Sequence, residues 1–293
     1  MHPRVDVIIV RLLRASVVGL GFTVPVARDV LERLDSGHRI LASAVLWSLW
    51  AIALLSVLVP ASSSLTALRL AAPAHLATLV LVSIAAGANL GSIIAVALSA
   101  IVAVVSASGE TGAYFVQSSA YGDEKRFPLR CPRPFLVVMV LAWLIWFSAA
   151  AVGAILLIGA AITGTVIGAI LVAVAAFCCA VFPRRFHRYS KRWLVEVPAG
   201  LVIHDHVLLT ETSMFPRRAV IDIDVWKPSD LGNDEPFDLS GGFRSTGIVI
   251  RLKDPETVIL APTKDHPGGQ AFHVSSARVC PTRIARALTL LKK

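Results

Sequence analysis

Residues 135–182 read FLVVMVLAWLIWFSAAAVGAILLIGAAITGTVIGAILVAVAAFCCAVF and contain no Asp, Glu, Lys or Arg. Arg133 stands just before this stretch, and Arg184 and Arg185 follow it. Because a helix needs about 20 apolar residues to cross a hydrocarbon core about 30 Å thick, the stretch predicts two spans, over about residues 135–158 and 163–182. Basic residues are retained on the cytoplasmic side of a membrane, so both ends of this hairpin are expected to be cytoplasmic.

The composition of the whole chain agrees with an integral membrane protein. Of the 293 residues, 56% are hydrophobic and 16% are charged, whereas soluble domains contain about 25% charged residues. A formal net charge of +9 would suggest nucleic-acid binding in a soluble chain, but here the basic residues cluster beside the predicted spans. We therefore expect these charges to meet a bilayer with anionic head groups, and we expect no nucleic acid.

The cysteines indicate neither a metal site nor a disulfide framework. Cys131 and Cys280 stand alone, and the adjacent pair Cys178-Cys179 lies within the apolar stretch. Reduced thiols on the cytoplasmic side are the expectation, and no cofactor is predicted.

The amino-terminal region, residues 1–37, is predicted to form two amphipathic helices at the cytoplasmic face of the membrane. The first is apolar but carries Arg11 and Arg14 on one face. Each arginine near a bilayer centre costs about 2.5 to 3.5 kcal/mol, so a helix at the interface, with both arginines at lipid head groups, is favoured over a span. The alternative is a signal peptide that is cleaved near residues 24–27. The second helix begins near Pro25.

Two more spans are predicted before the hairpin, which gives a four-helix transmembrane domain over residues 38–183. The first runs from about residue 40 to 59, and the second is a long, tilted or kinked helix from about 74 to 107. A single crossing by residues 74–107 leaves the basic loop that follows in the cytoplasm, whereas two crossings would place it outside. We therefore expect a multi-pass protein of the plasma (inner) membrane with both termini cytoplasmic.

Small residues recur at four-residue intervals in two of these spans. Gly87 and Gly91 form one GxxxG element, and Gly164 and Gly168 form another. Small residues let helix backbones approach closely in lipid, so these glycines are predicted to be helix-packing positions. The contact they serve is either internal to the bundle or made with another membrane protein or a second copy.

A basic juxtamembrane belt, residues 184–192, follows the last span. A cation near an anionic leaflet contributes about 1 kcal/mol, so this belt is predicted to hold the following domain against the membrane as well as to fix the topology. Its predicted head-group contacts are Arg184, Arg185, Arg188, Lys191 and Arg192.

From Trp193 the pattern changes to the alternation of a β domain, over residues 193–293. The predicted strands are residues 193–197, 201–204, 207–214, 220–226, 247–253, 257–261 and 270–275. Short turns are expected at residues 198–200 and 254–256, and Pro281 opens a helix whose apolar face covers one end of the sheet or barrel. His204 and His206 would share a strand face, but zinc normally needs three or four protein ligands, so they are interpreted as turn or surface histidines and no metal site is predicted.

Six or seven antiparallel strands followed by one helix resemble the bacterial pleckstrin-homology-like (PH-like) domains found beside membrane spans. The resemblance is carried by residues 193–203, residues 219–225 and the closing helix. The whole chain is also similar to multi-span membrane proteins of high-GC actinobacteria, which implies no mechanism. Eukaryotic relatives of this fold bind phosphoinositides with basic residues at the first hairpin, where this chain has Pro198-Ala199-Gly200, so head-group binding there is not expected.

The leading functional hypothesis is a non-enzymatic membrane adaptor, regulatory or assembly protein with a cytoplasmic PH-like interaction domain. The alternative is a membrane enzyme or transporter component that acts on lipid or cell-envelope precursors through the loop at residues 108–134. Glu110 is the acid–base candidate in that loop, but no partner stands at a fixed spacing, so no catalytic residue is assigned. His75, placed near one end of the second span, is the one strongly polar titratable residue expected in that span and the hairpin, which argues against a self-sufficient transporter.

Overall fold

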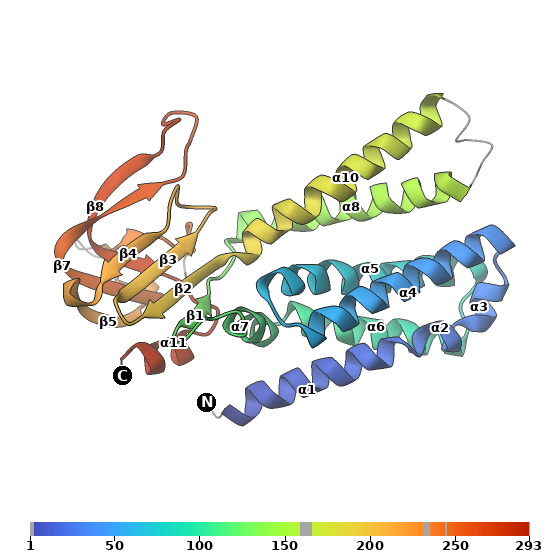
Figure 1. Ribbon diagram of the computed structural model, residues 1–293, viewed down its shortest axis with the longest axis horizontal. Helices are drawn as coiled ribbons and strands as arrows, with labels where there is room; N and C mark the ends of the chain where they lie inside the picture. Colours follow the sequence, from blue (N-terminus) through green and yellow to red (C-terminus); the bar gives the residue numbers. More distant parts are fainter. Residues whose placement is uncertain (1–2, 159–165, 231–234, 244, 293) are drawn as a thin grey trace. The chain divides into compact units, whose positions relative to one another are not determined.

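The computed structural model describes residues 3–158, 166–230, 235–243 and 245–292 of the chain. Two compact units divide it: a membrane unit, His2–Phe115 with Val138–His187, and a β unit, Val116–Val137 with Arg188–Lys293. Figure 1 shows the helical and the β part. Because the chain leaves the β unit and returns to it, two separate segments build this unit, and they bracket a hairpin of the helices α8 (Arg133–Ile158) and α10 (Val166–Ser190).

The amino-terminal part of the membrane unit is a bundle of four long helices, α1 (Pro3–Leu20), α4 (Ser36–Leu58), α5 (Ser62–Ala86) and α6 (Leu90–Ala107). The short helices α2 (Thr23–Val26) and α3 (Arg28–Glu32) connect α1 to α4 (Figure 1). The predicted interfacial helix therefore packs within the bundle: α1 contacts α4 and α6 and buries Leu13, Val17 and Leu20.

The prediction of one helix over residues 74–107 is wrong. Gly87, with φ of +79°, ends α5, and the Asn89 side chain accepts a hydrogen bond from the backbone N–H of Ser92 in a capping box that starts α6. A left-handed glycine followed by an Asn N-cap is a strong local signal that ends one helix and begins the next. Residues 61–72, which lie between the first two predicted spans, are mostly the first turns of α5.

The second helical pair is α8 (Arg133–Ile158) and α10 (Val166–Ser190), as predicted for the hairpin. α10 continues through Pro183, so most of the basic belt is helical. Residues 163–165 of the last predicted span lie outside the described residues. Five described helices, α4, α5, α6, α8 and α10, are long and apolar enough to cross a membrane. The chain is therefore a multi-pass membrane protein by length and composition, although with a different division of its helices from the four expected.

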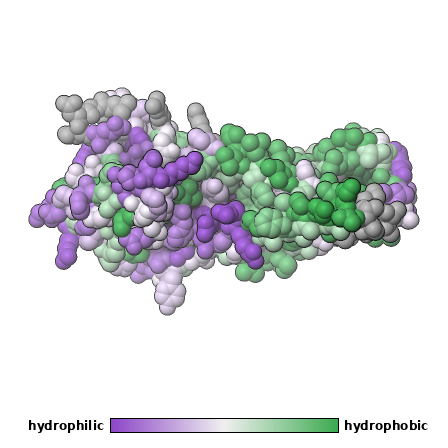
Figure 2. All heavy atoms as spheres, turned by 90° about the horizontal axis from the view of Figure 1, so that it is seen from above, coloured by the Kyte–Doolittle hydropathy of each residue, from purple (hydrophilic) through white to green (hydrophobic). Residues whose placement is uncertain are grey.

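Apolar side chains cover the outside of the membrane unit. Figure 2 shows its visible face as mostly hydrophobic, whereas hydrophilic residues dominate the visible face of the β unit. Large side chains such as Ile84, Leu90 and Phe177 are more than half exposed. A surface of this kind is stable in contact with lipid or with other apolar surfaces.

The β unit contains two four-stranded sheets. One has the order β1 (Lys125–Pro128), β2 (Arg192–Val197), β3 (Gly200–Asp205) and β4 (Ser213–Pro216), all antiparallel. The other has the order β5 (Val220–Trp226), β7 (Gly247–Leu260), β8 (Gln270–Val279) and β6 (Phe237–Asp238), in which the β6–β8 pair is parallel. Two short 3-10 helices, η1 (Arg217–Ala219) and η2 (Pro228–Asp230), flank β5.

One apolar core joins both sheets to the closing helix α11 (Ile284–Leu291). Phe215, Leu194 and Ile203 from the first sheet pack with Ile248 from the second and with Leu291. The predicted closing helix and most predicted strands are thus confirmed, so the broad class of helical membrane part plus β domain is correct.

Three features of the β unit differ from the predictions. β7 runs without a turn through residues 254–256, with only a register irregularity between Arg251 and Glu256. Residues 206–212 form turns and an isolated bridge before the short strand β4. β1 lies far upstream of the predicted boundary at residue 193, because a four-residue strand inside a polar loop gives almost no periodic signal.

Candidate functional site in the β unit

Strand β1 fastens the chain before α8 to the β unit. Beyond its ladder with β2, the N–H of Leu129 donates to the Arg192 carbonyl at 3.0 Å, and the N–H of Arg130 donates to the Cys280 carbonyl at 2.8 Å. The rings of Phe135 in α8 and Tyr189 in α10 lie 6.2 Å apart. The β unit therefore holds the entrance of α8 and the exit of α10 together.

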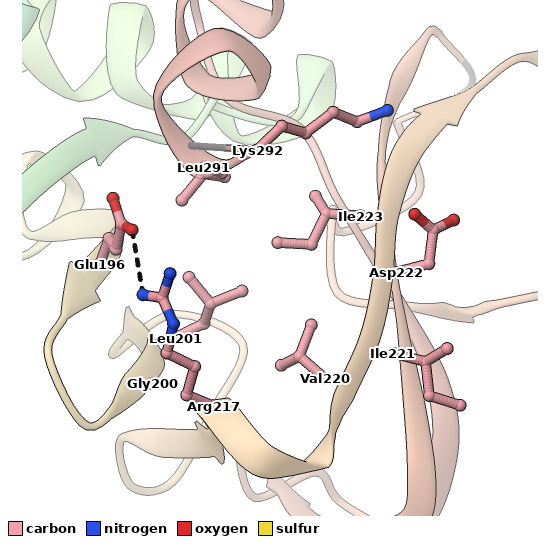
Figure 3. A pocket seen from close by; sticks show the side chains of 10 residues that line it. All are labelled: Glu196, Gly200, Leu201, Arg217, Val220, Ile221, Asp222, Ile223, Leu291 and Lys292. Atoms are coloured by element: carbon pink, nitrogen blue, oxygen red, sulfur yellow. Dashed lines mark hydrogen bonds and ion pairs between the residues drawn. The ribbon is translucent and has the colours of Figure 1, made fainter.

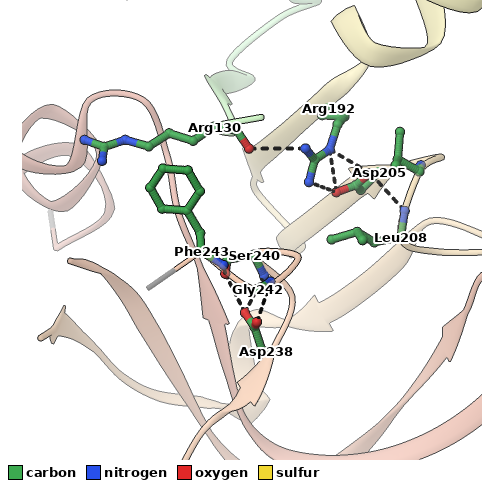
Figure 4. Close-up of polar contacts among 9 residues, drawn as sticks. Arg130, Arg192, Asp205, Leu208, Asp238, Ser240, Gly242 and Phe243 are labelled. Atoms are coloured by element: carbon green, nitrogen blue, oxygen red, sulfur yellow. Dashed lines mark hydrogen bonds and ion pairs between the residues drawn. The ribbon is translucent and has the colours of Figure 1, made fainter. Parts of the chain in front are cut away.

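A buried ion pair reinforces this junction. The Arg192 and Asp205 side chains are 2% and 1% exposed, and their closest charged atoms lie 2.8 Å apart. Arg192 Nη1 also donates to the Arg130 carbonyl at 3.2 Å, and Asp205 accepts from the backbone N–H groups of Val207 and Leu208 (Figure 4). The prediction that Arg192 contacts lipid head groups is corrected here, because its guanidinium is enclosed by the protein.

A second polar network orders the loop after β6. Burial opposes ionisation of Asp238, yet hydrogen bonds from the Ser240 hydroxyl and from the N–H groups of Ser240 and Gly242 hold its pKa below the ordinary value. Figure 4 shows these bonds converging on the carboxylate. Phe243, just beyond, lies under the Arg130 guanidinium, 5.7 Å from the ring centroid. The loop is therefore also tied to the segment before α8.

A pocket of about 440 Å³ opens between the β2–β3 turn, the first half of β5 and the end of α11. Leu201 and Leu291, both buried, and the half-buried Val220 and Ile223 form its apolar lining. Figure 3 shows Val220 and Ile223 directed into the pocket, whereas the side chain of Ile221, which borders the pocket on the same strand, points away from its interior. A volume of this size lies within the range of about 300 to 1,000 Å³ that is typical of ligand sites.

Charged groups stand on the rim of this pocket. Glu196 is shared: one carboxylate oxygen lies 2.9 Å from Lys125 of β1, and the other lies 3.5 Å from Arg217. Lys292, at the end of α11, pairs with Asp224 at 3.2 Å. A hydrogen bond from the N–H of Val225, and secondarily the Lys292 bond, lowers the pKa of Asp224. Asp222, which pairs with Arg251 at 2.9 Å, also lies on the rim. The pocket thus combines an apolar interior with two cationic and two acidic side chains at its opening.

The backbone of β5 adds a third element. β5 is the first strand in its sheet order and pairs with β7 on one side. An edge strand presents backbone N–H and C=O groups on its outer side that another extended chain can use.

At the β2–β3 turn, Gly200 is required, because a Cβ there would collide with the Phe215 carbonyl oxygen.

The predicted head-group contacts other than Arg192 lie in the basic belt and in α1. Arg184, Arg185 and Arg188 are exposed and Lys191 is half-buried, and their contact with lipid head groups stays a prediction. In α1, Arg11 and Arg14 are exposed, and Arg14 Nη2 donates to the Tyr114 hydroxyl at 3.2 Å.

The predicted packing glycines have different roles. Gly91 lies where a Cβ would collide with the Val26 carbonyl oxygen, so α2 and α6 approach as closely as a packing glycine allows. Gly87 belongs to the break between α5 and α6, which corrects its assignment as a helix-packing residue. Gly168 is buried in α10, and Gly164 lies outside the described residues. Gly153, which was not predicted, marks the contact of α8 with Ala175 of α10.

His204 and His206, interpreted as turn or surface histidines, occupy different positions: His204 is half-buried on β3, and His206 is exposed in the turn that follows. His204 stacks on Trp193, with ring centroids 5.0 Å apart, and its edge meets His206. Among the residues that the structure describes, no group of three His, Cys, Asp or Glu side chains could hold a metal ion. Glu110 is half-buried in the first turn of α7 (Gly109–Gln117).

The bundle contains a polar cluster that the sequence pattern placed wrongly. His75 lies near the middle of α5 and is fully buried; its ring nitrogens face Ser99 of α6 at 2.9 Å and Thr23 of α2 at 3.4 Å. Because α5 begins at Ser62 rather than near residue 74, His75 does not lie near a helix end, which is why the sequence underestimated its burial.

Two arginines cap helices from neighbouring elements. Arg33 Nη1 donates to the Ala86 and Gly87 carbonyls at 3.2 Å, at the end of α5. Arg69 donates to the Ser106 and Ser108 carbonyls at 3.2 and 3.3 Å, at the end of α6. Cations are favourable beside the carbonyl end of a helix, so both arginines have a structural explanation.

Comparison with known protein families, curated proteins and solved structures found no match for this chain.

Proposed function

We propose that the protein is a non-enzymatic membrane adaptor whose β unit binds a partner and whose hairpin α8–α10 responds to that binding. The observation that carries the proposal is the pocket on a β unit built from the two chain segments that bracket the hairpin. Glu196 links the two features, because it contacts Arg217 at the pocket rim and Lys125 on β1. An occupant that changes the Glu196 contacts would thereby act on the strand that leads into α8.

A PH-like fold for the β unit is part of this proposal. Two sheets around one core with a closing helix, α11, support it. The parallel β6–β8 pair and the contribution of β1 from the segment before α8 are departures from a contiguous domain of residues 193–293. The interaction surface proposed here therefore rests on the pocket geometry rather than on the fold name.

The membrane topology is proposed to have six crossings, with α1 and α2 together supplying one. Arg14 bonds to Tyr114 just beyond the end of α6, and Val26 lies against Gly91 at its start, so α1–α2 accompanies α6 over its length. The 18 residues of α6 measure about 27 Å, close to a hydrocarbon core of about 30 Å. Residues 15–27 contain no charged side chain, so this part of the crossing places no charge in the hydrocarbon core.

Six crossings place the amino terminus, the segment before α8 and the β unit on one side. The basic residues on that side include Arg4, Arg11, Arg14, Lys125, Arg126, Arg130, Arg133, Arg184 and Arg185. The opposite end of the bundle, residues 28–39, has Arg28, Arg33 and Arg39 beside Asp29, Glu32 and Asp35. Under the positive-inside rule, both termini are then cytoplasmic, with anionic head groups beside the exposed arginines of the belt.

The adaptor proposal is tested by photo-crosslinking in native membranes. A benzoylphenylalanine at position 223 faces the pocket, and the same group at position 221 points away from it on the same strand. We expect a defined protein adduct from position 223 that is absent from position 221. Identical adducts at both positions, or lipid adducts alone at position 223, would remove the support for an adaptor.

A second candidate function is a membrane enzyme or transporter component acting on lipid or envelope precursors. The observation that favours it is His75, because an ionisable residue buried in a membrane bundle often marks a functional site. Neighbouring Ser99 and Thr23 satisfy the ring, which suits a structural role equally well. Loss of a transport or turnover activity in His75→Gln or Glu110→Gln protein that remains folded would establish this function.

A further inference from the structure

We propose that the pocket of the β unit binds a peptide segment of the partner that presents an apolar side chain next to a carboxylate. The inference rests on the proposed adaptor function and specifies the chemistry of its partner. Three properties of the pocket carry it: the apolar interior, the unequal distances from Glu196 to Lys125 and Arg217, and the edge position of β5 among the described strands.

The apolar part of the segment would enter between the sheets. Leu201 and Leu291 are 5% and 6% exposed and belong to the core, and Val220 and Ile223 pack against it. An apolar side chain placed there would cover Val220 and Ile223 and gain free energy by leaving water.

The carboxylate follows from Arg217, the more exposed of the two cations on a rim that also carries Glu196 and Asp222. Glu196 lies closer to Lys125, at 2.9 Å, than to Arg217, at 3.5 Å, and the Arg217 side chain is 61% exposed. A guanidinium has five N–H donors, so one contact with Glu196 leaves most of its donors available. Arg217 is therefore the cation best placed to form a two-point bond with an incoming carboxylate, with Lys292 on the opposite rim in Figure 3.

The edge of β5 distinguishes a peptide from other amphiphilic anions. A peptide can use both the apolar interior and the backbone groups of an edge strand, as in recognition by strand addition. A fatty acid offers the same apolar tail and carboxylate but no backbone groups. The observations therefore favour a peptide segment, and a fatty acid becomes an outcome of the test.

The test is selection from a random octapeptide display library on the full-length protein in nanodiscs. Wild-type protein should enrich sequences with Leu, Ile, Val or Phe beside Asp or Glu. Arg217→Glu should abolish that enrichment. A fluorescent peptide from the wild-type selection should bind the Arg217→Glu protein at least about tenfold more weakly than wild type, as expected when a charged hydrogen-bond partner is lost. Arg218→Glu is the matched control, because Arg218 adjoins Arg217 but does not line the pocket, and it should retain binding.

Folding is controlled by comparing the thermal transitions of the variants, and Arg217→Gln provides a second variant without charge reversal. Enrichment that ignores acidic residues, or that survives Arg217→Glu, would overturn the inference. The inference would also be overturned if fluorescent oleate bound the wild-type protein but not Arg217→Glu, and if no selected peptide displaced the oleate. If the peptide inference is overturned but position 223 still gives a protein adduct, the adaptor proposal stands. The absence of both the adduct and the enrichment would reject both proposals.

Discussion

The bundle and the hairpin hold their helices together in different ways. In the 18-residue apolar stretch of α5, 44% of the residues are buried, whereas no residue of the corresponding stretch of α8 is buried. The bundle also has interhelical polar contacts, such as His75 with Ser99 and Trp50 with the Val17 carbonyl. The hairpin is instead fixed at its β-unit end, through Arg192 and β1.

This difference assigns different tasks to the two regions. In lipid, apolar contact alone provides little driving force between helices, so close packing and hydrogen bonds determine which helices associate. The bundle has both and is expected to be a stable scaffold. The hairpin, whose helix α8 is mostly exposed or half-buried, is expected to change its environment more easily, and the β unit is the part that controls its ends.

The largest expected effect comes from breaking the junction at the base of the hairpin. Asp205→Ala leaves the Arg192 charge buried without its partner, so we expect a loss of about 3 to 5 kcal/mol in the stability of the β unit. The thermal transition of purified protein and the rate of proteolysis after residue 192 would measure it. Asp222→Ala is the control, because it removes an ion pair whose side chains are about half exposed. Equal effects of the two substitutions would contradict the role given to the junction.

A smaller effect is expected from overpacking the bundle. Gly91→Ala places a Cβ against the Val26 carbonyl, and we expect it to cost about 1 to 3 kcal/mol and to lower the thermal midpoint of the membrane unit. Gly19→Ala in α1 has open space around its Cβ and should be neutral or slightly stabilising. If Gly91→Ala proves as harmless as Gly19→Ala, the close approach of α2 and α6 is incorrect.

The β unit should respond to mild acid through His204. Burial, and secondarily the neighbouring His206, lower the pKa of His204. A histidine whose pKa is lower in the folded than in the unfolded state stabilises the fold fully above its unfolded pKa of about 6.5, and this stability is lost as the pH falls below that value. Denaturation followed by Trp fluorescence at pH 7.5 and 5.5 would show the loss. His204→Gln should reduce the difference between the two pH values; an unchanged difference would assign it to other groups.

The smallest effect is expected at the surface of α3. Arg28 and Glu32 form an exposed i,i+4 ion pair, with side chains 76% and 48% exposed. Such pairs contribute little to stability, so Arg28→Ala should leave the thermal midpoint within experimental error. A clear loss would show that the opposite end of the bundle has contacts beyond those described.

Sequence reasoning found the long apolar helices and most strands because their periodic patterns extend over many residues. It failed where short local signals decided the structure: Gly87 and Asn89 divide a long apolar run, and residues 125–128 form a strand within a polar loop. The helix caps by Arg33 and Arg69 depend on contacts between separate elements, which spacing does not reveal.

The candidate site was harder to predict than the fold. Arg192 was assigned to lipid because it ends a basic run, and its distant partner Asp205 carries no signal in the sequence. The pocket residues Leu201, Ile223 and Leu291 form no motif and come together through the tertiary fold. Alternation along residues 220–226 gave the strand, but it did not show that β5 would be an edge strand.

The β1–β2 ladder joins the segment before α8 and the chain after α10 in one β unit. Its most direct test is a disulfide between Lys125→Cys and Glu196→Cys, positions that face each other in the β1–β2 register, in a chain whose native cysteines are replaced by alanine. Facing strand positions have Cα separations that suit a disulfide, and Val197→Cys, on the opposite face of β2, is the control partner. Rapid intramolecular crosslinking of 125 with 196 but not with 197 is the predicted result. No crosslink in protein that folds and inserts normally would contradict the shared sheet and, with it, the coupling of the pocket to the hairpin.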